Sequence, residues 1–328
     1  MSPLLITFIT IALTFDFLNG FHDSANIVAT MIASRAMSPR RAMLLSATAH
    51  FAGPFLFGVA VATTIGHEVV QPHANKIPVV MTALLAAIIW NLITWFLGLP
   101  SSSSHALIGG LVGATIVAYG IEAIQLRGLL KIVAALLLSP PIGLFGGYLL
   151  MKLTLFLARG ASPRINWFFK RAQILTALAL ALSHGANDAQ KTMGIITMGL
   201  MGAGALTQFQ IPLWVIAASA GAISLGTALG GWRIIRTLGG KFYKIRPIHS
   251  FTSQLGSTVV ILGAALWGGP VSTTQVVSSA ILGVGSAERL SKVRWGVTKS
   301  IITAWLLTIP ASALLAALIY MLLYQIVM

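Results

Sequence analysis

Long apolar runs, with very few charges between them, constrain this chain more than any other feature of its sequence. Most stretches between turn signals are about 17–30 residues long, enough for an α-helix to cross the hydrocarbon core of a bilayer. Only 8% of the residues are charged, against roughly 25% in soluble domains. The chain therefore lacks the charges to cover a water-facing surface. Short segments of alternating hydrophobicity, typical of membrane β-barrels, are not evident, so we predict an all-α polytopic membrane protein.

The few charges are strongly one-sided. Lys and Arg number 21 against 6 Asp and Glu, and the basic residues gather in short stretches between apolar runs. In a membrane protein such loops mark the cytoplasmic side, so the excess does not indicate a nucleic-acid partner. We expect a multi-pass protein of a cell inner membrane with both termini on the outer, periplasmic side. The chain has no cysteine, which excludes disulfides and Cys metal sites.

The basic and uncharged loops set the direction of the crossings. After a first span that ends near Ser34, we expect single crossings over residues 42–66, 128–157, 172–200, 213–230 and 295–326. Two segments remain, 77–118 and 251–287, and each begins and ends on one side of the membrane. Both hold Gly, Pro and a Ser/Thr cluster near their middle. Each is expected to be a hairpin or broken helix whose tip is covered by protein.

The two halves of the chain carry the same motifs in the same order. An Asp-containing signature, residues 20–26 and again 185–191, is followed at similar spacing by a Ser/Thr cluster. The first signature helix runs inward and the second runs outward. Together these features predict an inverted-topology repeat, the architecture of many secondary transporters.

This repeat divides the chain into three parts. Residues 1–157 form the first transmembrane repeat, with its hairpin near 98–118. Residues 158–171 form a basic cytoplasmic linker, and residues 172–328 form the second, inverted repeat, with its hairpin near 268–287.

Asp23 and Asp188 lie at matching repeat positions inside apolar spans. A carboxylate at that depth is costly unless it is paired, protonated or solvated. We interpret the two acids as coupling-cation ligands or proton carriers; satisfying a local helix break is the structural alternative. Asn26 and Asn187 add amide oxygens, and hard cations prefer oxygen ligands. Carbonyls of a locally unwound helix would complete such a site.

The Ser/Thr clusters look like helix starts. Pro suits the first helical turn, and Ser and Thr cap free N–H groups. Two such N-termini aimed at one point form an anion site, which a tetrahedral oxyanion would fill. Helix kinks that allow close packing are the alternative. The candidate anion-binding residues are Ser102, Ser103, Ser104, Ser272, Thr273 and Thr274.

Other polar side chains accompany these motifs. Lys191 is expected to pair with an acid or with the anion; its alternative is to extend toward an interface. His22 is a candidate proton carrier, with His184 as a similar residue. His105, Gln190 and Gln275 are candidates for direct contact or for orienting other groups. Asp16 is a further intramembrane acid for which the repeat offers no counterpart.

The residues above resemble the PiT family of inorganic phosphate transporters over essentially the whole chain. Residues 20–26 and 185–191 are similar to its duplicated Gly-x-Asn-Asp signature, and residues 100–105 and 270–275 to its Ser-rich hairpin motifs. The resemblance implies phosphate on Ser102–Ser104 and Ser272–Thr274. It also implies cations at Asp23, Asn26, Asn187 and Asp188, and a homodimer.

Two departures from the family pattern bear on the coupling ion. His22 and Lys191 stand where many members have Asn, which resembles the bacterial low-affinity branch, regarded as proton-coupled. A fixed ammonium could replace one sodium ion electrostatically. Proton coupling is therefore favoured, while bound sodium at Asp23 and Asp188 stays open.

The resulting hypothesis is a phosphate symporter embedded in the lipid bilayer, without enzymatic activity or an organic cofactor. It would carry free phosphate or a metal–phosphate complex. A sulfate or other oxyanion permease of the same fold is the first alternative. An anion channel is a second, disfavoured because the buried acid pair argues against anion flow without a coupled cation.

Overall fold

The computed structural model describes residues 2–327, which are helical almost throughout. The first half begins with the long helix α1, followed by the bent pair α2 and α3, the hairpin of α4 and α5, and the long helix α6. Their bounds are Pro3–Ala33, Pro39–Phe57, Ala60–Glu68, Ile77–Leu97, Ser103–Tyr119 and Leu126–Leu157. Short 3₁₀ turns lie at Pro72–Ala74 and Ile121–Ala123.

The second half repeats this order. A long helix, α7, is followed by the bent pair α8 and α9, the hairpin of α10 and α11, and the long helix α12. Their bounds are Ile165–Gly202, Leu213–Leu229, Trp232–Arg236, Pro247–Leu266, Thr273–Glu288 and Trp295–Val327. A π-helical turn, Thr237–Lys241, follows α9, and a 3₁₀ turn lies at Leu290–Lys292. The fold is therefore all-α with a repeated set of elements, as the sequence predicts.

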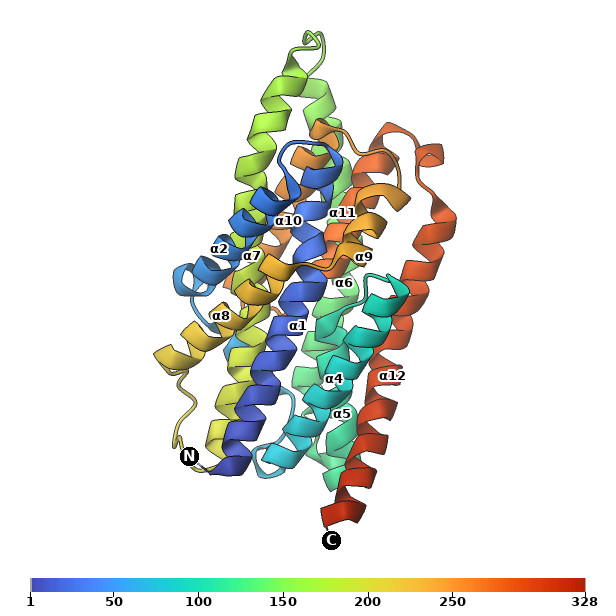
Figure 1. Ribbon diagram of the computed structural model, residues 1–328. Coiled ribbons are helices and arrows are strands. Elements are labelled where there is room, and N and C mark those ends of the chain that lie inside the picture. The colour runs from blue at the N-terminus through green and yellow to red at the C-terminus, as the bar shows by residue number, and fades with distance from the viewer. Residues whose placement is uncertain (1, 328) are drawn as a thin grey trace.

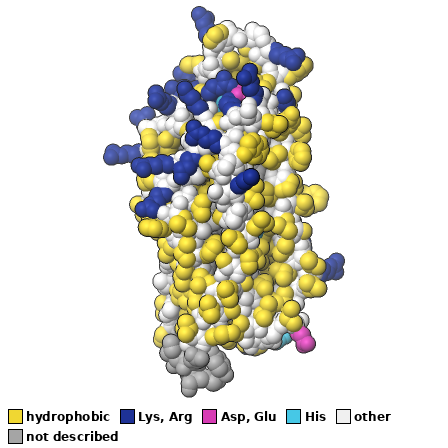
Figure 2. Space-filling view, turned by 90° about the vertical axis from the view of Figure 1, so that its right-hand side faces the viewer, with side chains coloured by type: hydrophobic (Ala, Val, Ile, Leu, Met, Phe, Trp, Pro, Cys, Tyr) yellow, Lys and Arg dark blue, Asp and Glu magenta, His cyan; other side chains and the backbone are white. Residues whose placement is uncertain are grey.

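The two hairpins enter the bundle from opposite ends. Figure 1 shows α4 and α5 rising from the end where α1 begins and α12 ends, while α10 and α11 descend from the other end. Figure 2 shows Lys and Arg side chains gathered at that other end, above a broad apolar surface. Opposite entry is the inverted relation that the motif order predicts.

Each hairpin turns through a left-handed glycine and a capping serine. Gly98 and Gly268 have φ angles of 68° and 70°, a conformation that glycine adopts without strain. Ser102 and Ser272 are the N-caps of α5 and α11, and each side chain accepts a hydrogen bond from the backbone N–H three residues on. Both predicted Ser/Thr clusters are therefore helix N-termini.

The two halves are interleaved in space. Helix α1 packs mainly on α8, and α7 packs on α2 as well as on α10, while α5 packs on α12 and α6 on α11. Signature glycines permit the first two contacts. A Cβ at Gly20 would lie 2.1 Å from the carbonyl oxygen of Ile223, and one at Gly185 would lie 2.5 Å from that of His50. Close approach at small residues is the usual way that membrane helices associate, so the sequence repeats are not separate spatial domains.

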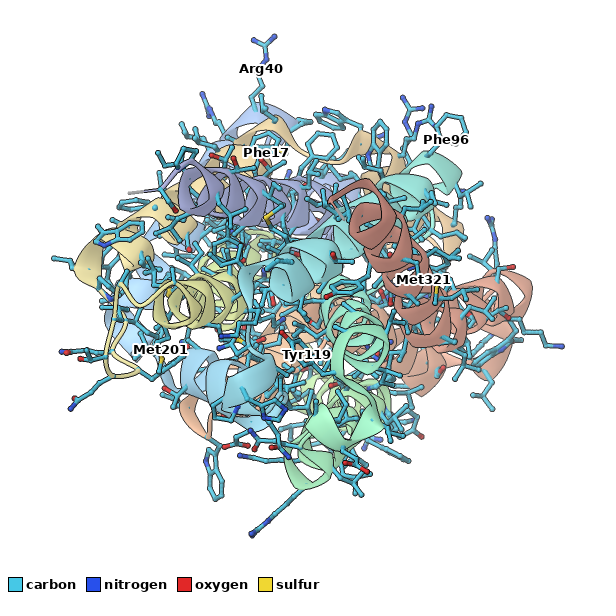
Figure 3. The ribbon with its side chains drawn as sticks, turned by 90° about the horizontal axis from the view of Figure 1, so that it is seen from below. Phe17, Arg40, Phe96, Tyr119, Met201 and Met321 are labelled. Carbon is cyan, nitrogen blue, oxygen red and sulfur yellow. The ribbon has the colours of Figure 1, made fainter. Side chains whose placement is uncertain are left out.

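Apolar side chains also point out of the bundle toward the expected lipid. Figure 3 looks along the bundle from the end that holds both termini. Tyr119, Met201 and Met321 label the C-terminal parts of α5, α7 and α12 in this view. Phe96 points away from the bundle in this view and is 64% exposed. Helices α1, α4, α6 and α12 are long and apolar enough to cross a membrane.

Two predicted crossings are bent rather than straight. Residues 42–66 divide into α2 and α3, which meet at 80°, and residues 213–230 continue past Gly230 into α9 at 59°. The sequence reading missed both bends. Gly58 and Gly230 mark them with φ angles of 77° and 67°, a backbone conformation that glycines in apolar runs do not reveal by themselves.

The expected interruption at the two signatures is wrong. Helices α1 and α7 run without a break through Asp23 and Asp188. Their carbonyls stay in the helical ladder, so they are not released as cation ligands. In addition, α7 begins at Ile165, inside the range 158–171 taken as the linker.

Candidate functional site

The candidate site lies where the tips of both hairpins meet the middle of α1 and α7. On α1, Asp16, Asn19, Asp23 and Asn26 follow helical spacing and share one face. On α7, His184, Asp188, Lys191 and Thr192 do the same. Since α1 and α7 run antiparallel, these two polar faces meet along their length.

Asp23 receives hydrogen bonds from the α11 tip and from its own neighbour. Thr274 Oγ1 donates to Asp23 Oδ1 at 2.9 Å, and His22 Nδ1 lies 2.7 Å from the same oxygen. Asn26 Nδ2 donates to Thr274 Oγ1 at 3.0 Å. The first signature and the second Ser/Thr cluster, almost 250 residues apart in the chain, therefore form one hydrogen-bonded group.

Thr273 links the two acids. Its Oγ1 donates to Asp188 Oδ2 at 2.9 Å and lies 3.4 Å from Asp23 Oδ2. A hydroxyl carries a single donor hydrogen, so the shorter contact is the better bond. Both carboxylates are at most 2% exposed, which means that water does not offset their repulsion.

Lys191 supplies the fixed positive charge of the cluster. Its ammonium pairs with Asp188 Oδ1 and donates to Ser104 Oγ at 2.6 Å and to the carbonyl of Val271 at 3.0 Å. All three partners are oxygens, and they come from α7 and from both hairpin tips. The ammonium therefore stands in a shell of oxygens such as a small cation would take.

Two histidines extend the cluster toward α2. His184 Nδ1 lies 3.4 Å from Asp188 Oδ2, one helical turn away, and its ring stacks on His50 with centroids 4.8 Å apart. His50 Nδ1 lies 2.7 Å from Thr227 Oγ1. His50 was missed from the sequence, because nothing in α2 indicates that it faces a signature helix. For His184, the four-residue spacing from Asp188 indicates that the two side chains share one face of α7.

The remaining predicted hairpin residues lie at the tips. Ser102 caps α5 and lies 2.7 Å from His105 Nδ1, while Ser272 caps α11 above Gln275. Ser103 Oγ and Gln275 Oε1 are buried and have no hydrogen-bond partner among the described residues. The tips therefore hold unused donor and acceptor capacity beside the acids.

Gln190 serves a different structure from the one we predicted. Its Nε2 donates to the carbonyl of Gly58 at 2.7 Å, and its Oε1 accepts from the N–H of Val61 at 2.8 Å. Gln190 therefore satisfies the backbone at the bend between α2 and α3. Among the described residues it is not hydrogen-bonded to either acid, because it lies on the opposite side of α7 from Asp188.

The cluster holds oxygen ligands of the kind that a hard cation takes. One ligand atom from each of Asp23, His184 and Asp188 lies within 4.8 Å of the others. The Oδ1 atoms of Asn26 and Asn187 are buried without a partner among the described residues. Unpartnered buried oxygens are uncommon and need an explanation. Because the backbone carbonyls of α1 and α7 stay in their helices, a cation here would take side-chain oxygens as ligands. The amide oxygens without partners are available for that role.

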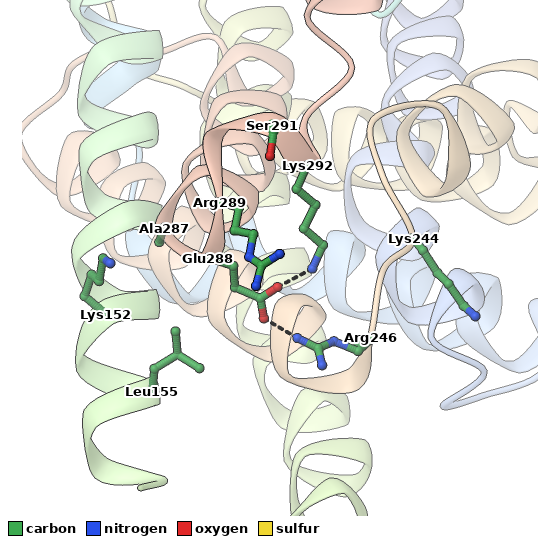
Figure 4. A pocket seen from close by; sticks show the side chains of 9 residues that line it. All are labelled: Lys152, Leu155, Lys244, Arg246, Ala287, Glu288, Arg289, Ser291 and Lys292. Atoms are coloured by element: carbon green, nitrogen blue, oxygen red, sulfur yellow. Dashed lines mark hydrogen bonds and ion pairs between the residues drawn. The ribbon is translucent and has the colours of Figure 1, made fainter.

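A separate cavity lies at the basic end of the bundle. It has a volume of about 840 Å³ and contains Lys152, Lys244, Arg246, Glu288, Arg289 and Lys292. Figure 4 shows Glu288 paired with Arg246 and Lys292 across it. None of its lining residues belongs to the buried cluster, so we do not place the candidate site there.

Burial and these basic partners set opposing effects on the pKa of Glu288. Burial raises it, but hydrogen bonds from Lys292 and His249 and the charge of Arg246 lower its pKa to about 2. Burial lowers the pKa of His249 to about 4, although Glu288 opposes this change.

Known proteins resemble this chain over nearly its full length. A "Probable low-affinity inorganic phosphate transporter" of Bacillus subtilis is 46% identical over 327 residues, covering 98% of both chains. A protein of the same description from Rhizobium meliloti is 44% identical, covering 97% of this chain and 96% of its own. A solved structure titled "The sodium-dependent phosphate transporter" matches with a TM-score of 0.87 and 27% identity, covering 99% of this chain and all of the other.

The family comparison agrees with the motifs and with the fold. The model of the "Phosphate transporter family" matches residues 19–316, which include both signatures and both hairpin tips. With these matches, the chain belongs to the phosphate transporter family.

Proposed function

We propose that this protein is a symporter that carries inorganic phosphate together with a coupling cation, and that the cation is a proton. The observation that carries the proposal is the closed cluster in which Asp23, Asp188 and Lys191 contact both hairpin tips. Family membership supports phosphate as the substrate. The choice of coupling ion rests on the residues of this chain.

Phosphate would bind between the tips of α5 and α11. Ser104 offers a hydroxyl, Thr273 and Thr274 would offer theirs on turning from the two acids, and the first turns of the two helices offer backbone N–H groups. Ser103 has no partner among the described residues and could donate as well. Four acceptor oxygens of a tetrahedral anion would match these donors from opposite sides.

The charges of the cluster require a cation to accompany the anion. Two carboxylates face one ammonium, so phosphate would add negative charge to a buried group that is already negative. Like charges at close range in a low dielectric repel strongly. Protons or sodium ions arriving with phosphate would offset this, which couples the two movements.

Lys191 supports proton coupling over full sodium coupling. Its ammonium occupies an oxygen shell made by Asp188, Ser104 and Val271. A permanent positive charge there would replace one sodium ion. His22 and His184 border the two acids and are the candidates for passing a proton to them. The sodium dependence named for the structural relative is the opposing indication.

Alternating access would follow from the interleaved repeats. The site lies between helices of both halves, and rocking of one bundle against the other would open it to either end. The basic end would face the cytoplasm by the positive-inside rule, with both termini on the outer side. We also propose a homodimer, on the family resemblance alone.

Labelled phosphate uptake into proteoliposomes tests the proposal. A proton gradient and a sodium gradient are imposed separately, with sulfate and a divalent metal added in parallel assays. Asp188→Asn and Ser104→Ala are compared with Ser219→Ala, a buried serine on α8 without a partner among the described residues. We expect uptake under the proton gradient, loss in the first two variants, and retention in the third.

Other results would change the assignment in defined ways. Uptake driven only by sodium would keep the carrier and reject proton coupling. Transport of sulfate without phosphate would reject the substrate. Uptake that increases with added divalent metal would identify the metal–phosphate complex as the species carried.

A further inference from the structure

A second group of buried oxygens lies on the outer side of the central cluster. Asp16 and Asn19 come from α1 and Thr192 from α7, and each is at most 1% exposed. Both carboxylate oxygens of Asp16, the Oδ1 of Asn19 and the hydroxyl of Thr192 have no hydrogen-bond partner among the described residues. Three acceptor oxygens and one hydroxyl are thus buried together, and the single hydrogen of the hydroxyl can satisfy at most one of those oxygens.

Helix geometry explains how these residues meet. Asp16 lies two turns before Asp23 on α1, and Thr192 lies about one turn after Asp188 on α7. Because the two helices run antiparallel, both positions are displaced toward the end that holds the termini. The side chain of Thr192 lies near the Asp16 carboxyl, and the charges of Asp188 and Lys191 reach that carboxyl from the same helix.

Among the described residues, Asp188 and Lys191 are the charges that act on Asp16. Helices α4 and α8 contain no ionisable residue, and the histidine of α2, His50, bonds to Thr227 instead. The helix surfaces beyond Asp16 toward the outer end are apolar, with Phe8 and Ala12 on α1 and Ile195 and Ile196 on α7 in the core. An ionised carboxylate without partners in such surroundings is strongly disfavoured.

On these observations we propose that Asp16, Asn19 and Thr192 form a second coupling-cation site, outward of the central cluster, and that its cation is a proton. A proton on Asp16 converts one unpartnered acceptor into a donor for the oxygen of Asn19 or Thr192. Three residues in a closed apolar setting are too few to surround a hard metal ion, which prefers about six oxygen ligands. The inference rests on the proposed symport and adds where the cation is held.

This placement gives the site a role in the transport cycle. A proton entering from the outer side would reach Asp16 before it reaches the Asp188–Lys191 pair. Loss of the proton toward the other end would leave a carboxylate beside Asp188, whose repulsion would favour reprotonation from outside. Asp16 would therefore bind its proton before phosphate is enclosed and lose it after phosphate is released.

Two transport assays on the same proteoliposomes test the assignment. Asp16→Asn mimics the protonated acid in shape but cannot release a proton, while Asp16→Glu retains the exchangeable group. Phosphate–phosphate exchange needs no net cation movement; accumulation under a proton gradient does. We expect Asp16→Asn to keep exchange within about twofold and to lose accumulation at least tenfold, with Asp16→Glu retaining part of both.

The opposing results are distinct. If Asp16→Asn lowers exchange and accumulation together, or changes neither, the proposal is wrong. Accumulation in the wild type that is driven only by sodium, and lost in Asp16→Asn, would replace the proton by sodium.

An infrared comparison tests the site even where no phosphate is carried. The difference spectrum between the wild type and Asp16→Asn at neutral pH should contain the C=O stretching band of a protonated carboxylic acid. Its absence overturns the proposal independently of the substrate. Its presence, with no phosphate transport, would leave the site intact and reject the proposed function alone.

Discussion

At the residue scale, Asp188 and Lys191 depend on each other. Both are at most 2% exposed, and among the described residues each is the only full charge of opposite sign that the other contacts. Removing one member of a buried pair leaves an uncompensated charge, whereas removing both is much less costly. The Asp188–Lys191 pair therefore adds little net stability. Its effect is that Asp188 allows the buried ammonium of Lys191 to stand at the site.

The first prediction follows from this dependence. Lys191→Met should destabilise the protein by about 3–5 kcal/mol, because Asp188 loses its partner. The double variant Asp188→Asn with Lys191→Met should recover most of that loss while remaining inactive. Thermal unfolding in detergent measures both, and a double variant no more stable than Lys191→Met would contradict the pairing.

The second prediction is that a change at Gln190 lowers stability and leaves the transport properties unchanged. Gln190→Leu removes the acceptor of the Val61 N–H and the donor to the Gly58 carbonyl. The free energy of unfolding should fall by roughly 1–3 kcal/mol, because buried backbone groups are left without a hydrogen bond. Because Gln190 does not contact the acids, the KM for phosphate and the ion dependence should stay as in the wild type. A changed coupling ion in this variant would restore the role that we first assigned to it.

Much of the central cluster could be predicted from residue types alone. Acids at matching depths in two apolar helices have few explanations, and Ser is a preferred residue at the N-cap of a helix, the position that Ser102 and Ser272 take. Gln190 and His50 could not be predicted. Their partners depend on where α3 begins and on which face α2 turns toward α7, and neither is encoded near them in the sequence.

At the element scale, glycine contacts set the spacing of the central helices. Gly20→Ala would drive a Cβ against the carbonyl of Ile223, 2.1 Å away. Backbone atoms cannot move aside as a flexible side chain can, so we predict a loss of roughly 1–3 kcal/mol from overpacking. The matched control is Gly221→Ala on α8, where a Cβ meets nothing within 4 Å. It should be neutral or stabilising by up to about 1 kcal/mol.

Thermal melting of the purified variants in detergent checks this pair. Equal melting temperatures for Gly20→Ala and Gly221→Ala would show that the α1–α8 contact is looser than the structure describes.

The basic end of α11 should lose stability on acidification in two stages. The pKa of His249 falls from 6.5 to about 4 on folding, so its neutral form is favoured and the folded state weakens between about pH 6.5 and 4. The pKa of Glu288 falls from 4.5 to about 2. Its contribution is complete above about pH 4.5 and is lost as the pH falls toward 2.

Melting temperatures measured from pH 7 to pH 3 test this sign. Glu288→Gln should flatten the lower part of the profile, and His249→Gln the upper part. Equal slopes in all three proteins would mean that the ion pairs of Glu288 are too solvated to matter, as many surface pairs are.

Helix breaks differ in how far the sequence reveals them. The hairpin turns were predictable, because Gly98 and Gly268 are followed by Pro and by capping hydroxyls in a row. The bends at Gly58 and Gly230 were not, because the glycines there lie in apolar runs without a proline or a capping side chain beside them. The continuity of α1 and α7 was also missed. Polar signatures suggested unwinding, yet their side chains find partners on other helices while the backbone keeps its own hydrogen bonds.

At the scale of the whole molecule, neither repeat forms a core alone. Helices α5 and α6 of the first half pack on α12 and α11 of the second, and α7 packs on α2. The order of motifs predicted the repeat and its inversion. It could not predict the interleaving, since a motif order is equally compatible with two repeats that fold side by side.

Separate expression of the halves tests the interleaving. Residues 1–164 and 165–328, each produced alone, should be degraded or aggregate, because the apolar and polar faces that normally meet the other half stay uncovered. Produced together in one membrane, they should assemble and recover phosphate uptake. Stable accumulation of either half alone would contradict the arrangement.

The interleaving also fixes an order of events during biosynthesis. The chain enters the membrane from its N-terminus, so α1 is inserted with Asp16 and Asp23 long before Thr273, Thr274 or Lys191 have left the ribosome. For that interval the two acids lie in a helix whose polar face has no partner, and proton uptake is the simplest way for lipid to tolerate them. Asp16 and Asp23 would thus be protonated from the insertion of α1 until the second half is inserted, before either residue takes part in transport.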